Sequence, residues 1–488
     1  MDISAFIKIL TFTLLLTVTI SFFSCEEDWQ PAEKGILSFS KDTLTFDTVF
    51  TTLGSATSKI LVYNNSNKVL NISDVKLAGG ASSYFRINVD GKIHKDHLFQ
   101  NISIRAKDSM YIFVEVTIDP QLTDAPVLIR DSVVFSLPGQ SKRILLEAFG
   151  QDMIILRNRV ILNDTILSDT KPYLIYGDLV VDSAKTLELA AGTRLFFHNN
   201  ANLLVYGNLK THGTFEKPVI LRGSRLDKIM FETPVPYHHV AGQWGGVYLL
   251  YKEGKHELNH LRMSSGYVGL YFYNADKRYR PVLEINNGII HNFVFYNLVA
   301  INGDVIVTNS EISNSGSYTV YLNGGNHRFY HCTIANYFGL NAAQAVNRTR
   351  KPAVMMMNLN RTMNMSTVFR NSIVTGTQEN EFTVASRYVS QYQGDFSHSY
   401  IRKTTDTAYT QYSNIRWHQR TDTVFMQARY DIKKKIYFDF DLDSLSPARG
   451  IADIAIAARF PLDLNGRNRL TDAKPDAGAY EWFPTVNP

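Results

Sequence analysis

Cysteine and charge are both scarce in this sequence. Only two of its 488 residues are cysteines, and charged residues make up 19% of the chain. The net charge is +5, and lysine and arginine occur only in short runs. Because nucleic-acid binding leaves a basic patch or stripe, we expect no nucleic-acid partner. Aromatic residues, in contrast, reach 12%, which indicates a folded chain, since disorder requires few aromatics and a high net charge.

The apolar run Ile9–Phe23 is too short to cross a bilayer as a helix, which takes about 20 residues. It suits the hydrophobic region of a signal peptide. A small residue and then Cys25 follow it, which resembles the lipobox of bacterial lipoproteins, although Phe22 stands where an aliphatic residue is usual. The resemblance implies a signal peptide over residues 1–24 and acylation of Cys25, so that the chain is held by membrane lipid. An ordinary cleaved signal peptide and an uncleaved anchor are the alternatives.

Three acidic residues, Glu26, Glu27 and Asp28, open a tether over residues 25–35. The cluster resembles the signal that directs lipoproteins of the Bacteroidota to the outer face of the outer membrane. The resemblance implies an outer-membrane lipoprotein, with the cell surface favoured over the periplasmic side. A solvated charge run gives the same pattern. With Cys25 acylated, Cys332 has no disulfide partner, and its strand-like surroundings indicate a buried small hydrophobe.

The chain is too long for one ordinary core, so we expect two folded units, of which one is a solenoid. Residues 36–151 consist of short runs of alternating polarity, such as residues 111–116, separated by turn residues. This spacing is typical of a β-sandwich. The order of its features is similar to that of immunoglobulin-like domains related to those of abnormal-spindle and Hydin proteins. Such domains are usually spacers or binding modules.

Residues 287–292, 309–314 and 331–336 form repeats at a constant step, and residues 371–376 form a fourth copy after a longer interval. The repeats superimpose Ile290, Ile312 and Ile334 in one column, and Asn292, Asn314 and Asn336 in another. A step of this length fits one coil of a parallel β-helix, whose turns bury aliphatic columns against each other. We expect the asparagines to be a structural ladder at a bend.

The solenoid is expected to cover residues 152–483. Opening motifs such as residues 172–181 and 187–197, together with Pro461-Leu462-Asp463 and Asp476-Ala477-Gly478, resemble the coils and C-terminal cap of bacterial β-helix lipoproteins. The chain therefore resembles the right-handed parallel β-helix repeat lipoproteins of the Bacteroidota. The expected fold is all-β, an immunoglobulin-like β-sandwich followed by a pectate-lyase-like solenoid. This fold supports many functions, so it does not specify one.

No pattern in the sequence predicts a metal or a cofactor. Asp439, Asp441 and Asp443 alternate with apolar residues, which indicates one acidic face of a strand, and the residues of a calcium loop are missing after them. His238 and His239 lack a third ligand at a suitable spacing. No clustered pair of aspartates of the kind that glycosidases use is found in the repeats.

The best candidates for ligand binding are the basic residues Arg348, Arg350 and Lys351, together with His331 and Tyr337. A lyase needs a cation to neutralise a uronate and a base to remove a proton. The three cations lie in the interval between His331 and Asn371, which is nearly twice as long as the step between the other repeats. We expect an additional coil there, preceded by an exposed loop that carries the cations. A solvated basic loop is the alternative.

Two functions remain open. The first is a non-catalytic module that binds a glycan or another envelope protein along the flat side of the solenoid, with exposed Tyr or Trp stacking on sugar rings. The second is a lyase or hydrolase that acts on an acidic polysaccharide. The absence of an acid and base pair in the repeats favours the module.

Overall fold

The computed structural model describes residues 37–230, 234–251, 253–339, 348–359, 364–386, 391–403, 410–428, 438–471 and 473–484. The expected signal peptide, Cys25 and the acidic tether lie outside these residues. Within the described ranges, no helix has the length and apolar character needed to span a membrane. The chain divides into two units, one that combines the residues up to Gln121 with Pro126–Gln151, and one that combines Leu122–Ala125 with the chain from Asp152 onward.

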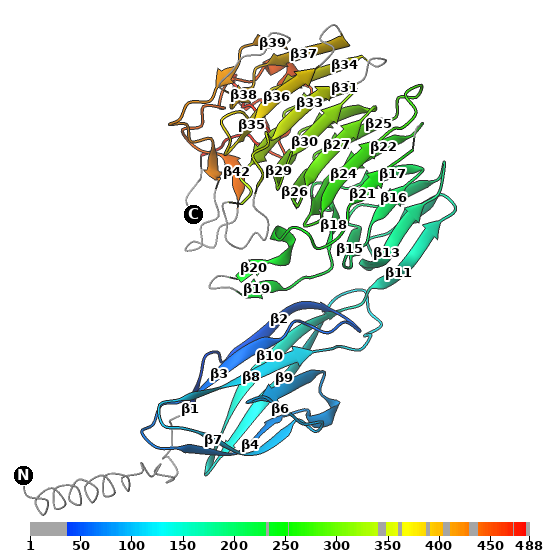
Figure 1. Cartoon of the computed structure of the whole chain (residues 1–488). Coiled ribbons are helices and arrows are strands. Elements are labelled where there is room, and N and C mark those ends of the chain that lie inside the picture. The colour runs from blue at the N-terminus through cyan, green and yellow to red at the C-terminus, as the bar shows by residue number, and fades with distance from the viewer. Residues whose placement is uncertain are drawn as a thin grey trace, which may run out of the picture. The chain divides into compact units, whose positions relative to one another are not determined.

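The first unit is a β-sandwich of two five-stranded sheets (Figure 1). One sheet has the order β1 (Leu37–Phe39), β3 (Ser58–Asn64), β8 (Ser109–Val116), β5 (Phe85–Val89) and β6 (Lys92–Ile93). The other has the order β2 (Thr43–Phe50), β10 (Gln140–Gln151), β9 (Val127–Leu137), β4 (Leu70–Leu77) and β7 (Leu98–Ile104). Successive side chains of a strand point to opposite sides of the sheet, which explains which residues are buried. In β8, for example, Met110, Ile112 and Val114 point into the core between more exposed neighbours.

The second unit is a parallel β-helix whose coils between residues 194 and 397 each contribute three strands, so the expected fold class is confirmed (Figure 1). The first face is β12 (Thr165–Leu167), β14 (Thr186–Leu189), β17 (Asn208–His212), β22 (Lys255–Asn259), β25 (Val282–Asn286), β28 (Asp304–Thr308), β31 (Gly325–Tyr330), β34 (Met365–Arg370), β37 (Tyr392–Ser397) and β39 (Thr410–Ser413).

The other two faces belong to one continuous sheet that opens with β11 (Ile154–Ile161) and β13 (Tyr173–Val181). The second face is β15 (Arg194–Phe197), β18 (Val219–Gly223), β23 (Leu261–Ser264), β26 (Ile289–Phe293), β29 (Glu311–Ser315), β32 (Thr333–Asn336), β35 (Ile373–Gly376), β38 (Tyr400–Ile401) and β40 (Arg416–Trp417). The third face is β16 (Leu203–Val205), β21 (Val247–Leu249), β24 (Val268–Tyr273), β27 (Tyr296–Ile301), β30 (Val320–Asn323), β33 (Val354–Asn358) and β36 (Phe382–Ser386).

The register confirms the constant step of the repeats, since Ile290 pairs with Ile312 and Ile312 pairs with Ile334. Ile334 then pairs directly with Val374, so the long interval before Asn371 contains no additional coil, and that expectation was wrong. The apolar run at residues 354–358 is the third-face strand of the same coil. Most of the surplus residues lie between β32 and β33, and the rest lie between β33 and β34. Connections between the strands of a solenoid can be lengthened without disturbing the stacked strands.

A column of left-handed residues forms the bend between the first and second faces. His260, Asn287, Asn309, His331, Asn371, His398 and Asn414 all have φ between +47° and +55°. Side chains in this column bond from coil to coil, as in Asn309 Nδ2 to Asn287 Oδ1 at 2.6 Å. The predicted ladder of Asn292, Asn314 and Asn336 lies one bend later along the coil. There the side-chain amides bond mainly to groups other than the neighbouring asparagines, as when Asn292 Nδ2 donates to the His239 carbonyl.

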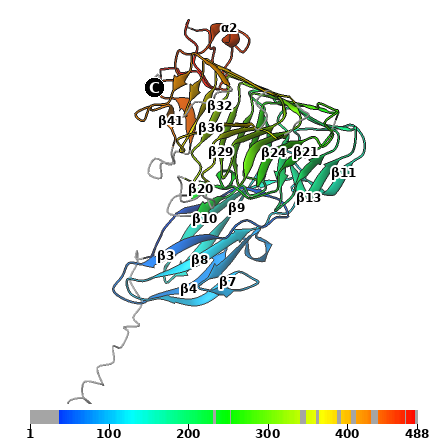
Figure 2. The same cartoon turned by 45° about the horizontal axis from the view of Figure 1, so that its top comes forward.

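The C-terminal part of the chain, which includes the segment that we expected to cap the β-helix, runs along the second face (Figure 2). It contains β41 (Phe425–Gln427), β42 (Asp439–Leu442) and the short α2 (Ile454–Ala457). Three successive residues join it to three coils, because Gly478 N–H donates to the Asn371 carbonyl, Ala479 N–H donates to Thr333 Oγ1, and the Tyr480 hydroxyl donates to Glu311. The apolar side of β42 packs on the outside of the same coils.

Candidate functional site

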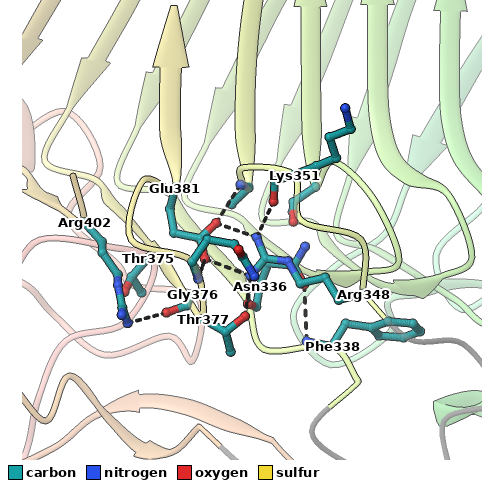
Figure 3. A network of polar contacts seen from close by, with 12 residues as sticks. Asn336, Phe338, Arg348, Lys351, Thr375, Gly376, Thr377, Glu381 and Arg402 are labelled. Carbon is teal, nitrogen blue, oxygen red and sulfur yellow. Dashed lines mark hydrogen bonds and ion pairs between the residues drawn. The ribbon is translucent and has the colours of Figure 1, made fainter. Parts of the chain in front are cut away.

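The residues of the predicted basic site do not lie together, because Arg348 is buried while Arg350 and Lys351 are exposed. The Arg348 guanidinium forms a bidentate pair with Glu381, at 2.8 and 2.5 Å, and also donates to the Asn336 carbonyl and Thr377 Oγ1 (Figure 3). The side chains of Arg348 and Glu381 are only 4% and 0% exposed. Arg348 therefore does not lie on an exposed loop as we expected, because Glu381 from the next coil neutralises it inside the protein.

The other four predicted residues do not converge with Arg348 on one open site. His331 is buried in the left-handed column and bonds to Asn371. Tyr337 stacks on Phe440 beneath the C-terminal segment. Arg350 and Lys351 are exposed, so ligand binding by these two residues stays a prediction.

A different cluster of side chains covers the outside of the third face. We call it the tyrosine face, and it consists of Tyr248, Tyr271, Tyr273, Tyr296, Tyr318 and Tyr321. The alternation of β24 explains it, because Leu270 and Phe272 point into the core and leave Tyr271 and Tyr273 outside. Tyr248 pairs with Tyr271 on the adjacent strand, and Val299 joins Tyr271 to Tyr321 two strands further on.

The rings of the tyrosine face contact one another along the solenoid. Tyr248 and Tyr271 have ring centroids 5.7 Å apart, and Tyr296 stacks on Tyr318 at 6.1 Å with an angle of 7° between the rings. Partial burial raises the pKa values of Tyr248, Tyr271 and Tyr321. Their hydroxyls therefore stay neutral and retain the ability to donate hydrogen bonds at physiological pH.

A cavity of about 550 Å³ lies between the second face and the C-terminal segment, and we call it the carboxylate cavity. Its floor is formed by outward-facing residues of β26 and β29, including His291, Asn292 and Glu311. Its roof is Asp439 and Asp441 from β42, together with residues that include Asn465 and Tyr480. His239 contributes from the short 3-10 helix Tyr237–His239, which belongs to the insertion after β18.

Glu311 is the most deeply held carboxyl of the cavity. It accepts from Ser313 Oγ through one oxygen and from the Tyr480 hydroxyl through the other. Burial raises its pKa, and burial likewise raises the pKa of Asp439. Asp441 differs, because Arg467 Nη2 donates to it at 2.9 Å and Asn465 Nδ2 at 2.8 Å.

The histidines of the cavity are neutral. Burial lowers the pKa of His291 to about 4 and holds the pKa of His239 well below its ordinary value. Among the described residues, no group of three or more His, Cys, Asp or Glu is arranged to hold a metal ion. The lining therefore offers neutral rings and hydrogen-bonding oxygens.

Sequence reasoning considered His239, Asp439 and Asp441 but set them aside separately, since their spacing matched no motif. One signal in the repeats was overlooked. Glu311 occupies a column in which Ile289 and Thr333 are its neighbours on the adjacent coils, and Arg262 lies two coils away. A lone acidic residue in such a column needs a partner, and Tyr480 supplies a hydroxyl donor from 169 residues away.

Comparison with known proteins gives no family. No family model matches the sequence, and no curated protein matches it. Three solved structures share 10 to 12% identity with it, each at a TM-score of 0.17. The matches cover 25% of this chain and 30% of a family 123 glycoside hydrolase from Clostridium perfringens, 27% and 96% for a PapD-like domain of human CEP192, and 27% and 61% for a protein of unknown function from Porphyromonas gingivalis W83. This chain thus spans less than a third of the hydrolase, and the three likenesses assign it neither a family nor an activity.

Proposed function

We propose that this protein is an outer-membrane lipoprotein that binds a glycan along the tyrosine face without cleaving it. The lipid anchor rests on the lipobox-like sequence that ends at Cys25. The binding role rests on one observation, the outward-facing tyrosines of consecutive coils, which form two ring clusters, Tyr248 with Tyr271 and Tyr273, and Tyr296 with Tyr318 and Tyr321. Parallel strands lie about 4.8 Å apart, so the rings form a platform that extends along the solenoid.

Tyrosine suits contact with sugars for two reasons. Its ring covers the apolar C–H face of a sugar, and its hydroxyl bonds to the polar groups at the ring edge. Tyr273 is 37% exposed, and nearby Tyr267 and Phe295 are 38% and 48% exposed. Large aromatic side chains exposed together in this way mark an interaction surface.

The charge beside the tyrosine face favours an acidic glycan. Lys351 lies with its ammonium 5.9 Å from the centroid of Tyr318. A carboxylate or sulfate group on a sugar stacked at Tyr318 would lie within reach of this cation. The basic segment thus contributes through Lys351 at the edge of the platform, while Arg348 is held inside the protein.

The test is glycan binding by the intact protein in detergent, measured by calorimetry with alginate and dextran as the charged and neutral polymers. Replacing both Tyr271 and Tyr321 by Ala should weaken binding of either polymer by about tenfold or more, since aromatic anchors dominate binding energy. Tyr111→Ala is the matched control, because Tyr111 is an exposed tyrosine of the β-sandwich. Equal affinity in the parent and the double variant would contradict the proposal.

Two further readouts belong to the same experiment. Lys351→Ala should weaken binding of alginate at low salt and leave dextran unchanged, because exposed charges are screened beyond about 10 Å at 0.1 M ionic strength. Release of unsaturated or reducing ends from either polymer would show that the protein is an enzyme, and would overturn the non-catalytic part of the proposal.

A further inference from the structure

The carboxylate cavity has polar capacity that the folded chain does not use. Asn292 lines it and is 1% exposed. Its Nδ2 donates to the His239 carbonyl, but among the described residues nothing donates to its Oδ1. A buried oxygen without a donor is costly, at roughly 1–3 kcal/mol, and is rare in folded proteins. A donor from outside the chain would satisfy it.

The hydrogen-bond directions around the cavity show which kind of ligand is complementary. Ser313 and Tyr480 already donate their hydroxyl protons to Glu311. Arg467 and Asn465 donate to Asp441. These four donors are thus engaged within the protein, whereas Asp439 and Asn292 present acceptor oxygens. A complementary ligand must be rich in donors.

The charge of the lining argues against a cationic ligand. Asp441 is paired with Arg467, the charge of Arg262 acts on buried Glu311, and burial lowers the pKa values of the two histidines. Apolar surface is present as well, from Ile289, Phe438 and Phe440. The ligand should therefore be uncharged, with hydroxyl donors on its edge and an apolar C–H face. A cavity of about 550 Å³ lies within the usual range of small-molecule sites, roughly 300–1,000 Å³.

We infer that the carboxylate cavity binds a single neutral sugar residue, whose hydroxyls donate to Asp439 and Asn292 while its C–H face packs against Phe438. This site lies on the second face of the solenoid and is distinct from the tyrosine face on the third. It does not rest on glycan binding at the tyrosine face, and each site has its own variants.

The parts of the cavity come from distant stretches of sequence. Asn292 and Glu311 lie on adjacent coils, His239 comes from the insertion after β18, and Asp439 comes from the C-terminal segment. The direct bonds from Tyr480 to Glu311 and from Asn292 to His239 hold these parts together. The site is therefore organised before a ligand arrives, which lowers the entropic cost of binding.

The test uses the full-length protein in detergent and ligand-detected NMR with glucose, galactose, mannose and N-acetylglucosamine as neutral probes. Glucosamine and glucuronate serve as the cationic and anionic probes. We expect saturable binding of at least one neutral sugar, and a loss of about tenfold in Asp439→Asn, which removes one charged acceptor. Asp443→Asn is the matched control, because Asp443 follows β42 and does not line the cavity.

A second variant keeps the test decisive if Asp439→Asn folds poorly. Phe438 is a partly exposed residue of the roof, so Phe438→Ala should preserve the fold and still weaken binding of the sugar, because it removes the apolar contact. The double variant of Tyr271 and Tyr321 should bind the same monosaccharide as the parent does. Three outcomes would overturn the inference, namely no binding of any neutral probe at millimolar concentration, binding of glucosamine alone, or equal affinity in the parent and both cavity variants.

Discussion

Two buried arginines of the second unit, Arg348 and Arg469, are stabilised by partners from a neighbouring coil or from the C-terminal segment. Arg348 pairs with Glu381 from the following coil, and Arg469 of the C-terminal segment bonds to Asn309 at 2.6 Å and to Glu481 at 3.4 Å. Neither Arg348 nor Arg469 is exposed to more than 4% at its side chain. Each guanidinium is thus a structural connection, and removing its partner leaves a charge in a poorly solvated environment.

Replacing Arg348 by Ala should therefore destabilise the β-helix by about 3–5 kcal/mol, since it leaves the Glu381 carboxyl buried without its cation. Arg350→Ala, two residues away and exposed, should change the free energy of unfolding by less than about 0.5 kcal/mol. Urea unfolding followed by the fluorescence of buried Trp244 measures both. Similar midpoints for the two variants would mean that the ion pair contributes nothing to stability.

His256 should make stability depend on pH. Its Nδ1 accepts from the Leu209 N–H at 3.2 Å, which requires an unprotonated nitrogen, and burial lowers its pKa to about 4. Between pH 6.5 and 4 the unfolded chain binds a proton at this residue and the folded chain does not. The contribution of His256 to the free energy of unfolding should thus fall by up to about 3 kcal/mol as pH drops through that window, and should stay constant above it.

The variant His256→Asn isolates this share of the pH dependence, since an amide oxygen still accepts from Leu209 but does not titrate. Unfolding midpoints at pH 7 and pH 4.5 should differ less in the variant than in the parent. Other buried histidines, such as His327, keep their share in both proteins. An identical pH slope in the two proteins would refute the assignment.

At the scale of elements, the left-handed bend sets the direction of each coil between the first and second faces. Asparagine suits this position because it adopts positive φ at little cost and carries an amide that bonds to the next coil. In the next column, Ser310 and Ser372 accept from backbone N–H groups of the preceding coil. Cys332 occupies the same column, fully buried, and the buried small residue that its sequence context predicted is confirmed.

Asn309 allows a test of the bend. Asn309→Ala should cost about 2–4 kcal/mol, because alanine at φ +48° is strained and buried Arg469 loses an acceptor. Asn309→Gly should be about 1 kcal/mol more stable than the alanine variant, since glycine relieves only the strain. Urea unfolding again measures both. Equal stability of the two variants would show that backbone conformation is not the reason for asparagine here.

At the scale of the whole molecule, the solenoid has the tyrosine face on one side and a C-terminal segment on another. The tyrosine face lies on the third face, and the second face is covered between Glu311 and Asn371 by the segment that ends near Trp482. A solenoid permits this division, because each coil is stabilised by its neighbours and its outer surface is free to vary.

The proposed lipid anchor predicts where the whole protein is found. Cys25→Ala should convert it from membrane-pelleted to soluble, because several acyl chains hold far more tightly than a single one. Fractionation of cells that produce the parent and the variant, followed by immunoblotting, measures the shift. A cleaved but unacylated signal peptide would leave both proteins soluble, and an uncleaved anchor would leave both in the membrane, and either result would defeat the lipoprotein proposal.

The sequence by itself determined the fold, because the period of the apolar residues, both within a strand and from coil to coil, is a local property of the chain. Alternating residues such as those of β8 and the step from Ile290 to Ile312 are visible without coordinates, and they require strands and stacked coils. The same reasoning wrongly predicted an additional coil before Asn371. A long connection between two strands and an additional coil lengthen the interval by similar amounts, so the sequence does not distinguish them.

Only the tertiary structure decided which side chains meet. Arg348 looked exposed until Glu381 was placed beside it, and Asp439 looked like part of the acidic face of a strand until β42 was placed over Glu311. The physical reason is that burial and hydrogen bonding act between residues far apart in sequence, as in the 169 residues between Glu311 and Tyr480. A charge that appears solvated in the sequence becomes a structural pair or a binding group only when the folded chain brings its partner to it.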